Sequence, residues 1–258
     1  METRVRSWLE LQEAVFDSTW QPSLQRHRSN FVFRGTPRAS HGLETSLQTG
    51  GFEAKERHLL TSFRKYALRS AVHGDLVWNW LSLAKHHGLP TRLLDWTYSP
   101  YVAMHFATHD FRHFDEDAAI WCVDYRKTNE LLPDPLCRMA AREDVNIFTT
   151  ELIAGVARTL DEYDALAEND FVVFFEPPSL DERIVNQFAL FSLPSSPTLR
   201  LQSLLEQREA TYRKIIIPAA LKWEIRDKLD QANVTERVLF PGLDGLSQWL
   251  KRYFATRV

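Results

Sequence analysis

The chain has 258 residues, of which 44% are hydrophobic and 25% charged, as is typical of one large globular domain rather than a disordered chain. Lys and Arg number 31 against 34 Asp and Glu, so the formal net charge of −3 gives no bulk indication of nucleic-acid binding. Cys122 and Cys137 are too few for a disulfide framework or a four-cysteine zinc site. Neither a signal peptide nor an apolar stretch of membrane-spanning length is recognisable, so we expect a cytoplasmic protein.

Hydrophobic periodicity predicts the elements in chain order. Ser7 is a suitable N-cap for a helix over 7–20, which we expect as an N-terminal appendage ended by Pro22. Residues 30–34 alternate as in a strand. The other predicted helices cover about 52–71, 75–87, 101–107, 150–160, 181–186, 218–231 and a last segment carrying Leu246, Trp249, Leu250 and Tyr253. The other predicted strands cover about 91–97, 118–125, 171–175, 188–193 and 215–217.

Positions inside two of these helices can also be predicted. In the helix over 52–71, the side chains of Leu59, Phe63 and Tyr66 are expected to point inward. An aspartate, Asp75, is the expected N-cap of the next helix. That helix should end at Gly88, which stands where a C′ glycine is favoured.

The order of the elements predicts an α+β fold with a mainly antiparallel or mixed central sheet flanked by helices. Helices and strands do not alternate regularly, which argues against a doubly wound parallel sheet. The sequence has no Walker motif and no G-x-G-x-x-G pattern. No linker or repeat divides it, so we expect a single domain over 1–258.

Three polar segments are candidates for chemistry, and the first is Phe33-Arg34-Gly35. The guanidinium of Arg34 suits a phosphate or carboxylate, and Gly35 would let a ligand or another chain approach the backbone. The structural alternative is a strand-end arginine paired with a surface acid. If Arg34 binds an anion, replacing it by lysine should damage function while leaving the melting temperature nearly unchanged.

The second candidate segment, residues 83–97, contains two histidines, an arginine, an aspartate and a tryptophan around a helix end. Asp95 can orient a histidine ring or pair with Arg92. The alternative is a polar network that only ties the helix to the strand. The members singled out are His86, His87, Arg92, Asp95 and Trp96.

The third segment follows the apolar strand at 171–175. Glu176 lies at its end, and Arg183 and Gln187 are four residues apart, so one helical turn places them on the same side. A solvated helix face would look similar. Polar groups that interrupt apolar elements need partners. We therefore expect polar side chains from the three segments to converge on one cleft. The converging residues should be Arg34, His87, Arg92, Asp95 and Gln187.

A histidine stripe offers a fourth possibility, a metal site. His105, His109 and His113 are spaced at i, i+4 and i+8, with Asp110 and Asp115 nearby. The stripe lacks an HExxH pattern and lies at the polar end of its helix. We therefore interpret it as solvated surface and expect no bound transition metal.

Together the segments resemble the FRG domain family. Phe33-Arg34-Gly35 resembles the motif that names the family, and the run at 83–107 resembles its central signature. The third block departs at Ala189, where the family more often has glycine. The other similar positions are Arg183, Ile184, Gln187 and Phe191, together with the closing segments 215–218 and 239–245, so the resemblance covers about 25–255.

This resemblance implies a layout similar to that of ADP-ribosyltransferases, which is a fold-level analogy. Arg34 would occupy the early strand position that meets NAD, and residues 95–97 would match the second strand motif. Glu176 or Gln187 would match the late catalytic position. FRG domains are also associated with bacterial toxins and antiphage defence, so the resemblance makes such a role plausible.

The leading hypothesis is an enzyme that cleaves the nicotinamide–ribose bond of NAD, by ADP-ribosyl transfer or by hydrolysis. The reaction passes through a cation-like ribose that a carboxylate can stabilise. Arg34 would bind phosphate beside Gly35, and Glu176 would be the carboxylate. The other expected contacts are Trp96 stacking on a base, Arg183 and Gln187 on ribose or phosphate, and His86 or His87 donating to phosphate or a ribose hydroxyl.

Two alternatives remain open. One is a metal-independent nuclease or phosphodiesterase, with His86 and His87 as acid and base and with Arg34 and Arg92 on phosphate. The other is a non-catalytic module that binds nucleotide or nucleic acid. The acceptor, the choice between transfer and hydrolysis, the oligomeric state and any operon partner stay open at this stage.

Overall fold

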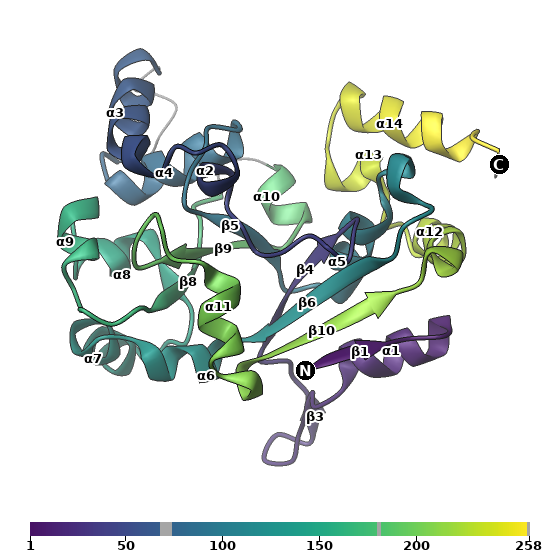
Figure 1. Cartoon of the computed structure of the whole chain (residues 1–258), viewed down its shortest axis with the longest axis horizontal. Coiled ribbons are helices and arrows are strands. Elements are labelled where there is room, and N and C mark those ends of the chain that lie inside the picture. The colour runs from purple at the N-terminus through teal and green to yellow at the C-terminus, as the bar shows by residue number, and fades with distance from the viewer. Residues whose placement is uncertain (68–73, 180–181, 257–258) are drawn as a thin grey trace.

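A long twisted sheet forms the centre of the molecule (Figure 1). The computed structural model describes residues 1–67, 74–179 and 182–256. Its main sheet has eight strands in the order β1-β10-β6-β4-β5-β9-β8-β7, mostly antiparallel, with parallel pairing of β1 to β10 and of β7 to β8. These strands are β1 (Glu2–Arg4), β4 (Phe31–Thr36), β5 (Leu94–Thr97), β6 (Ala118–Asp124), β7 (Phe148–Thr149), β8 (Val172–Glu176), β9 (Ala189–Pro194) and β10 (Tyr212–Ile217). The predicted α+β fold with a mixed sheet is confirmed.

Helices cover both faces of this sheet. The described helices are α1 (Trp8–Phe16), α2 (Ser46–Thr49), α3 (Glu56–Tyr66), α4 (Val77–His86), α5 (Pro100–Thr108), α6 (Tyr125–Thr128), α7 (Asp134–Glu143), α8 (Thr150–Ala154), α9 (Leu160–Asp164), α10 (Glu182–Asn186), α11 (Leu201–Glu206), α12 (Lys222–Gln231), α13 (Glu236–Leu239) and α14 (Leu243–Tyr253). Within the described part of the chain, no helix has the length and apolar character needed to cross a membrane.

Three clusters of buried side chains form the core. The α4 core, under α3, α4, α7, α8 and α9, includes Trp78, Leu81, Tyr163, Val173 and Phe191. The α5 core, under α1, α5 and α12, includes Leu11, Phe33, Met104, Ile120 and Ile225. The back core, under α11, includes Val32, Trp96, Trp121, Phe174 and Leu204. Because neighbouring residues of one strand divide between the first two clusters and the third, these clusters lie on opposite faces of the sheet.

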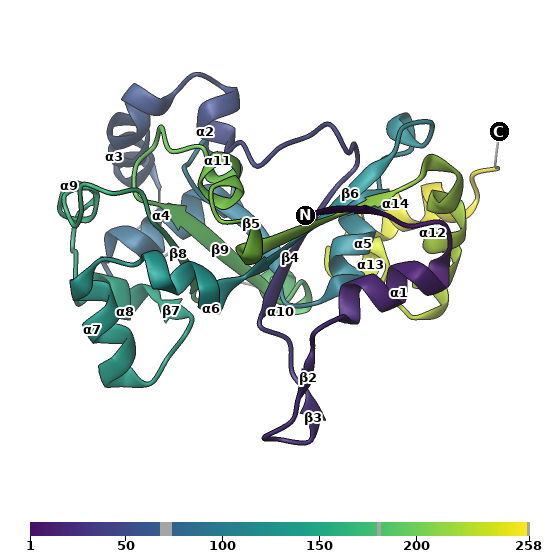
Figure 2. The same cartoon turned by 60° about the horizontal axis from the view of Figure 1, so that its bottom comes forward.

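The N-terminal segment belongs to the core, so the prediction of an appendage is wrong. Ser7 does cap α1, since its hydroxyl accepts a hydrogen bond from the Glu10 N–H. The helix ends at Phe16 rather than near residue 20, and the chain continues into a short hairpin, β2 (Trp20–Gln21) with β3 (Arg26–His27), that projects from the body (Figure 2). Leu11 and Val15 are fully buried, and β1 adds a strand to the main sheet.

Two helix predictions need correction. The helix predicted over 52–71 is a 3₁₀ turn followed by α3, and residues 68–71 lie outside the described residues. Tyr66 is 80% exposed instead of pointing inward. Asp75 does not cap α4, because its carboxylate accepts hydrogen bonds from Arg64 and from the indole N–H of Trp80, and Leu76 takes the N-cap position.

The middle of the chain departs most from the prediction. The helix expected over 150–160 is two short helices, α8 and α9, and α7 was missed altogether. The elements β1, β7, α11 and α13 were not predicted either. Short elements of this kind are stabilised by packing against the rest of the fold, which periodicity cannot detect. Asp181, placed in the helix predicted over 181–186, lies outside the described residues.

The strand predicted over 30–34 continues through Gly35 to Thr36 as β4. The glycine is needed for packing: an added Cβ would lie 1.9 Å from the Ala103 carbonyl oxygen and 2.7 Å from the Ala107 nitrogen of α5. The close neighbour of the Gly35 backbone is therefore α5 of the same chain, where the sequence predicted a ligand or another chain.

We expect Gly35→Ala to destabilise the fold, because the new methyl group would force α5 away from β4. Overpacking of this kind typically costs about 1–3 kcal/mol, and the backbone atoms of a helix cannot give way as a side chain can. Urea denaturation measures the loss. Gly42→Ala is the control, since its Cβ would meet only the side-chain ends of Gln202 and Glu44. Equal stability of the two variants would contradict the packing argument.

The sheet opens between β4 and β5. These strands share one paired position, Phe33 with Thr97, whereas β4 pairs with β6 over six positions and β5 with β9 over four. Beyond Phe33 the backbones of β4 and β5 diverge and no longer pair with each other. Each strand remains paired with its other neighbour, β4 with β6 and β5 with β9. Arg34 and Asp95 lie in this divergence, and a cleft is formed here.

Candidate functional site

A cleft of about 650 Å³ lies where the α4 core and the α5 core meet, over the opening between β4 and β5. Its size is in the range of small-molecule and cofactor sites. The lining residues come from β4, the C-terminal end of α4, β5, the end of α5, α10 and β9. They are Phe33, Arg34, Gly35, Pro37, Lys85, His86, His87, Gly88, Asp95, Trp96, Thr97, Phe106, His109, Arg183, Ile184, Gln187, Ala189 and Phe191.

Arg34 reaches across the divergence of the two strands. Its Nη1 donates a hydrogen bond of 2.8 Å to the Asp95 carbonyl oxygen and lies 3.8 Å from the Asp95 carboxylate. Burial lowers the pKa of the Arg34 guanidinium, and the charge of Asp95 opposes that shift. The Nε atom is buried and has no hydrogen-bond partner. Arg34 therefore ties β4 to β5 through Nη1 while its side chain lines the cleft.

Asp95 is the carboxylate of the cleft. Lys85 Nζ lies 2.9 Å from its Oδ2, and the carboxylate side chain remains 55% exposed to the cleft. Desolvation raises the pKa of Asp95, but the charges of Lys85 and Arg34 outweigh it and hold that pKa below the usual range. Asp95 is therefore ionised at neutral pH.

This depressed pKa has a consequence for stability. A carboxyl group with a lower pKa in the folded state stabilises the fold above its unfolded pKa of 3.8, and the gain is lost as the pH falls through the folded value. We expect the stability difference between the parent and Asp95→Asn to be constant at pH 5–8 and to shrink below about pH 4. Urea denaturation across this range measures it, and a difference that grows in acid would contradict the argument.

The two adjacent histidines lie at the end of α4. His87 is the C-cap residue and Gly88 follows with a φ of +81°, as predicted for a C′ glycine. The His86 and His87 rings meet edge to face, with centroids 5.2 Å apart. Both residues line the cleft, so the C-terminal end of α4 brings two histidines to the cleft that also contains Asp95.

The third predicted segment also lines the cleft. Arg183 and Gln187 both lie there, as their four-residue spacing predicted. The guanidinium of Arg183 stacks over the Phe240 ring at 4.8 Å. Gln187 donates from Nε2 to the Leu239 carbonyl oxygen, and Asn186 donates to the neighbouring Val238 carbonyl. These bonds fix α10 against α13, so part of the amide of Gln187 serves the fold.

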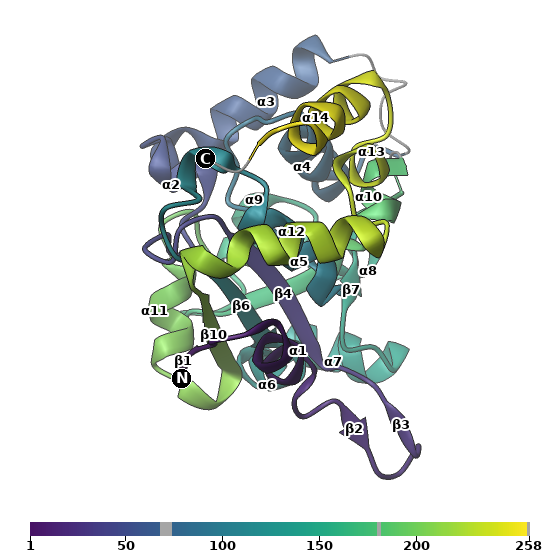
Figure 3. The ribbon, with the colours of Figure 1, turned by 90° about the vertical axis from the view of Figure 1, so that its right-hand side faces the viewer.

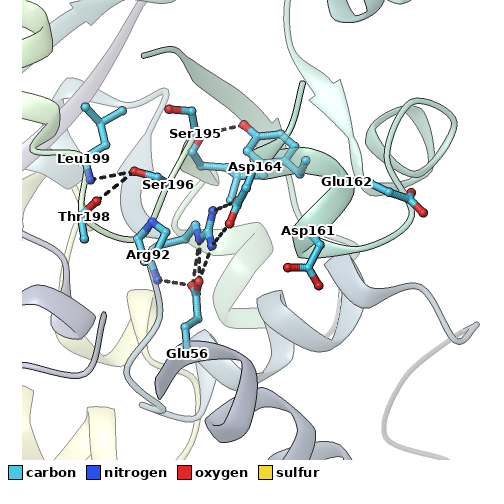
Figure 4. A network of polar contacts seen from close by, with 12 residues as sticks. Glu56, Arg92, Asp161, Glu162, Asp164, Ser195, Ser196, Thr198 and Leu199 are labelled. Carbon is cyan, nitrogen blue, oxygen red and sulfur yellow. Dashed lines mark hydrogen bonds and ion pairs between the residues drawn. The ribbon is translucent and has the colours of Figure 1, made fainter. Parts of the chain in front are cut away.

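Arg92 does not line the cleft, so that part of the predicted convergence is wrong. Its side chain is fully buried and forms hydrogen-bonded ion pairs with Glu56 and Asp164 (Figure 4). Burial lowers the pKa of Arg92, but the two carboxylates outweigh it and raise that pKa. The backbone N–H of Arg92 also donates to Glu56. All three side-chain nitrogens of Arg92 therefore donate to carboxylates within the fold, and no phosphate can reach this buried side chain.

Two further site predictions are also corrected. Glu176 lies outside the cleft, exposed, and accepts a hydrogen bond of 2.8 Å from the Tyr98 hydroxyl. Trp96 belongs to the back core: its indole N–H donates to Ser192 and its ring packs edge to face on Phe174. Side chains alternate along β5, so Asp95 faces the cleft while the indole of Trp96 lies behind the sheet and cannot stack on a ligand there.

The histidine stripe is not a single solvated face, because α5 ends at Thr108. His105 is fully buried, and its Nδ1 lies 3.0 Å from Arg226 Nη1. His109 lines the cleft, and His113 pairs with Glu116. Among the residues that the structure describes, no three His, Cys, Asp or Glu side chains gather as a metal site. The absence of a bound metal remains a prediction.

Sequence reasoning missed three lining residues of importance. Lys85 precedes the two histidines in the same segment, but its contact with Asp95 depends on the approach of α4 to β5. Phe106 and His109 lie near the end of α5. Their spacing of three residues places them on neighbouring positions of a helix surface. This spacing could have indicated that both side chains face the same cleft.

The comparison with protein families supports the resemblance seen in the sequence. Residues 29–116 match the family model described as the FRG domain. This range contains β4, α4, β5 and α5 and hence Arg34, the two histidines and Asp95. The chain has no match among curated proteins or among solved structures.

Proposed function

We propose that this chain, which carries an FRG domain over residues 29–116, is an enzyme that binds NAD in the cleft and cleaves its nicotinamide–ribose bond. The products would be ADP-ribosyl groups on a macromolecule or free ADP-ribose. Within this proposal the fold is ADP-ribosyltransferase-like, and NAD binds over the opening between β4 and β5. The chain then acts as a toxin or antiphage effector.

The observation that carries the proposal is the charge of the cleft. Arg34, Lys85 and Arg183 place three permanent cations around one carboxylate, Asp95, among the lining residues described. A positive cleft in low-dielectric surroundings attracts an anionic ligand. The guanidinium of Arg34 lines the cleft and has the fork geometry that fits phosphate oxygens. A pyrophosphate group matches this geometry and the positive charge of the cleft.

The remaining lining residues suit the other parts of a dinucleotide. Phe106, which is half-buried and lines the cleft, provides apolar surface for a base, replacing the stacking predicted for Trp96. Asp95 takes the part first given to Glu176, because an ionised carboxylate beside the ribose stabilises positive charge as the bond to nicotinamide breaks. Gln187 and Arg183 lie where they can contact ribose or phosphate.

A second candidate is supported by the pair of histidines. His86 and His87 meet at the edge of the same positive cleft, an arrangement that suits acid–base cleavage of a phosphodiester without metal. Nucleotide binding without turnover would fit the same cleft.

The deciding experiment incubates the purified chain with NAD, alone and with nucleic acid or cell lysate, and measures nicotinamide and modified macromolecules by mass spectrometry. We expect nicotinamide release from the parent and almost none from Asp95→Asn. Binding of NAD without nicotinamide would indicate a binding module. Cleavage of nucleic acid in the presence of a chelator, with NAD untouched, would favour the histidine mechanism.

A matched control uses Glu176→Gln, which removes the carboxylate that lies outside the cleft. It should release nicotinamide at the parental rate. If Glu176→Gln abolished the reaction while Asp95→Asn did not, the assignment of the carboxylate would be overturned.

A further inference from the structure

Phe240, the residue after α13, contacts two side chains of the cleft without lining the cleft itself. The guanidinium of Arg183 lies over its ring, with Cζ 4.8 Å from the ring centroid. The ring also meets Phe106 edge to face, with centroids 6.1 Å apart. Arg183 and Phe106 line the cleft, whereas Phe240 lines a second cavity of about 570 Å³, which Arg183 also borders. Phe240 therefore supports Arg183 from the side of the second cavity.

The segment that carries Phe240 also fixes α10, the helix on which Arg183 lies. Figure 3 shows α13 next to α10. Asn186 Nδ2 of α10 donates a hydrogen bond of 2.9 Å to the Val238 carbonyl oxygen. Gln187 Nε2 donates one of 2.9 Å to the Leu239 carbonyl oxygen. A helix of five residues is not stable by itself, so these contacts set the position of α10 at the cleft.

The backbone of Phe240 is held in place by α14. An added Cβ at Gly245 would lie 1.9 Å from the Phe240 carbonyl oxygen, so α14 packs directly against it. An ion pair of 2.6 Å between Arg252 Nε and Glu236 Oε1 joins α14 to α13, and both side chains are buried. The ring is thus carried by a fixed part of the fold and can support a longer, more flexible side chain such as that of arginine.

The charge of Arg183 acts inside the cleft. Desolvation raises the pKa of Asp95, but nearby positive charges outweigh it. These charges belong to Lys85, Arg34 and, with the smallest effect of the three, Arg183. The Arg183 guanidinium is therefore close enough to interact with the cleft carboxylate. Stacking uses the face of a guanidinium and leaves its N–H donors, which lie in the plane of the group, available for an anion.

We propose that Phe240 is a positioning residue, which holds the Arg183 guanidinium at the wall of the cleft for binding to a phosphate group of the nucleotide. This inference rests on the proposed function. Without the ring, the long arginine side chain would sample several rotamers, and ligand binding would have to order it at a cost in affinity. A cation–π contact at a half-buried site corresponds to about 2- to 30-fold in binding. The effect should fall on binding rather than on the chemical step, because Arg183 is assigned to phosphate and not to the reacting carbon.

The test measures binding of NAD and of inorganic pyrophosphate to the full chain by isothermal titration, together with KM and kcat for nicotinamide release. Phe240→Leu keeps apolar bulk but removes the aromatic face, so it should raise Kd and KM about 2- to 30-fold with kcat nearly unchanged. Phe240→Tyr retains the aromatic face and should restore the lower Kd. In an Arg183→Met background, Phe240→Leu should have no further effect, because the ring acts through the arginine.

The chain offers a matched control in the pair Arg237 and Trp249. The Cζ of Arg237 lies 4.7 Å from the centroid of the Trp249 ring, and neither residue is among the described lining residues of the two cavities. Trp249→Leu should therefore leave Kd and KM unchanged. Melting temperatures of all variants report any loss of stability, and such a loss would weaken binding equally with and without Arg183.

The outcomes separate this inference from the proposed function. If Phe240→Leu binds NAD as tightly as the parent, or weakens binding equally in the Arg183→Met background, the inference is overturned and the proposed function stands. Pyrophosphate binding that depends on Phe240, without binding of NAD, would overturn the proposed function alone. A parent chain that binds neither NAD nor pyrophosphate would overturn both.

Discussion

Replacing Arg34 by lysine is expected to reduce NAD binding or turnover about 10- to 150-fold, the equivalent of losing roughly 1.5–3 kcal/mol of charge-assisted hydrogen bonding. Lysine keeps the positive charge but loses the planar fork. Isothermal titration with NAD and nicotinamide release measure the effect.

The structure changes the expectation for the stability of these variants. Because Arg34 joins β4 to β5 through the Asp95 carbonyl oxygen, Arg34→Ala should lower the free energy of unfolding by about 0.5–1.5 kcal/mol, whereas the sequence alone predicted a nearly unchanged melting temperature for Arg34→Lys. Arg6→Lys, at an exposed pair with Glu10, is the control and should be silent in both assays. A lysine variant at position 34 with parental activity would remove Arg34 from the proposed binding site.

Replacing Arg92 by alanine should produce the largest loss of stability, about 3–5 kcal/mol, with a corresponding fall in the urea midpoint. Glu56 is 2% exposed, so the substitution leaves its carboxylate buried without its ion-pair partner. Asp164 is less affected because it is partly exposed and also contacts Arg57. The cost arises from uncompensated buried charge rather than from lost contact area.

A double substitution separates this cause from a simple packing defect. Arg92→Met with Glu56→Leu removes both charges and retains apolar volume, so it should recover much of the stability. Arg57→Ala removes only a half-exposed pair with Asp161 and Asp164 and should cost at most about 1 kcal/mol. If Arg92→Ala cost no more than Arg57→Ala, the buried network would not be a major source of stability.

Local patterns were sufficient wherever an element is defined by its own residues. The C′ glycine Gly88, the cap at Ser7 and the apolar strands β6, β8 and β9 were all predicted close to their observed positions. The polar residues that interrupt such elements could also be recognised as candidates, because a polar side chain next to an apolar strand needs a partner. Arg34, His87, Asp95 and Gln187 do meet in one cleft.

Long-range packing decided what local patterns could not. Arg92 and Asp95 are three residues apart in the same segment, yet one is buried against Glu56 and Asp164 while the other faces the cleft. The partners of Arg92 lie 36 and 72 residues away in the sequence, so no spacing rule could identify them. Gly35 likewise gave a correct signal of close approach but not the identity of the neighbour, which is α5.

The sequence by itself therefore determined the fold class, the family resemblance and a set of candidate polar residues. Each of these depends on residue type and on spacings of a few positions, which set backbone conformation and the face to which a side chain points. The tertiary structure decided which candidates share a cleft, that Lys85 forms an ion pair with Asp95, and that the indole of Trp96 and the carboxylate of Glu176 lie outside the cleft. These facts depend on which strands pair and where the sheet opens, and hence on contacts between residues far apart in the chain.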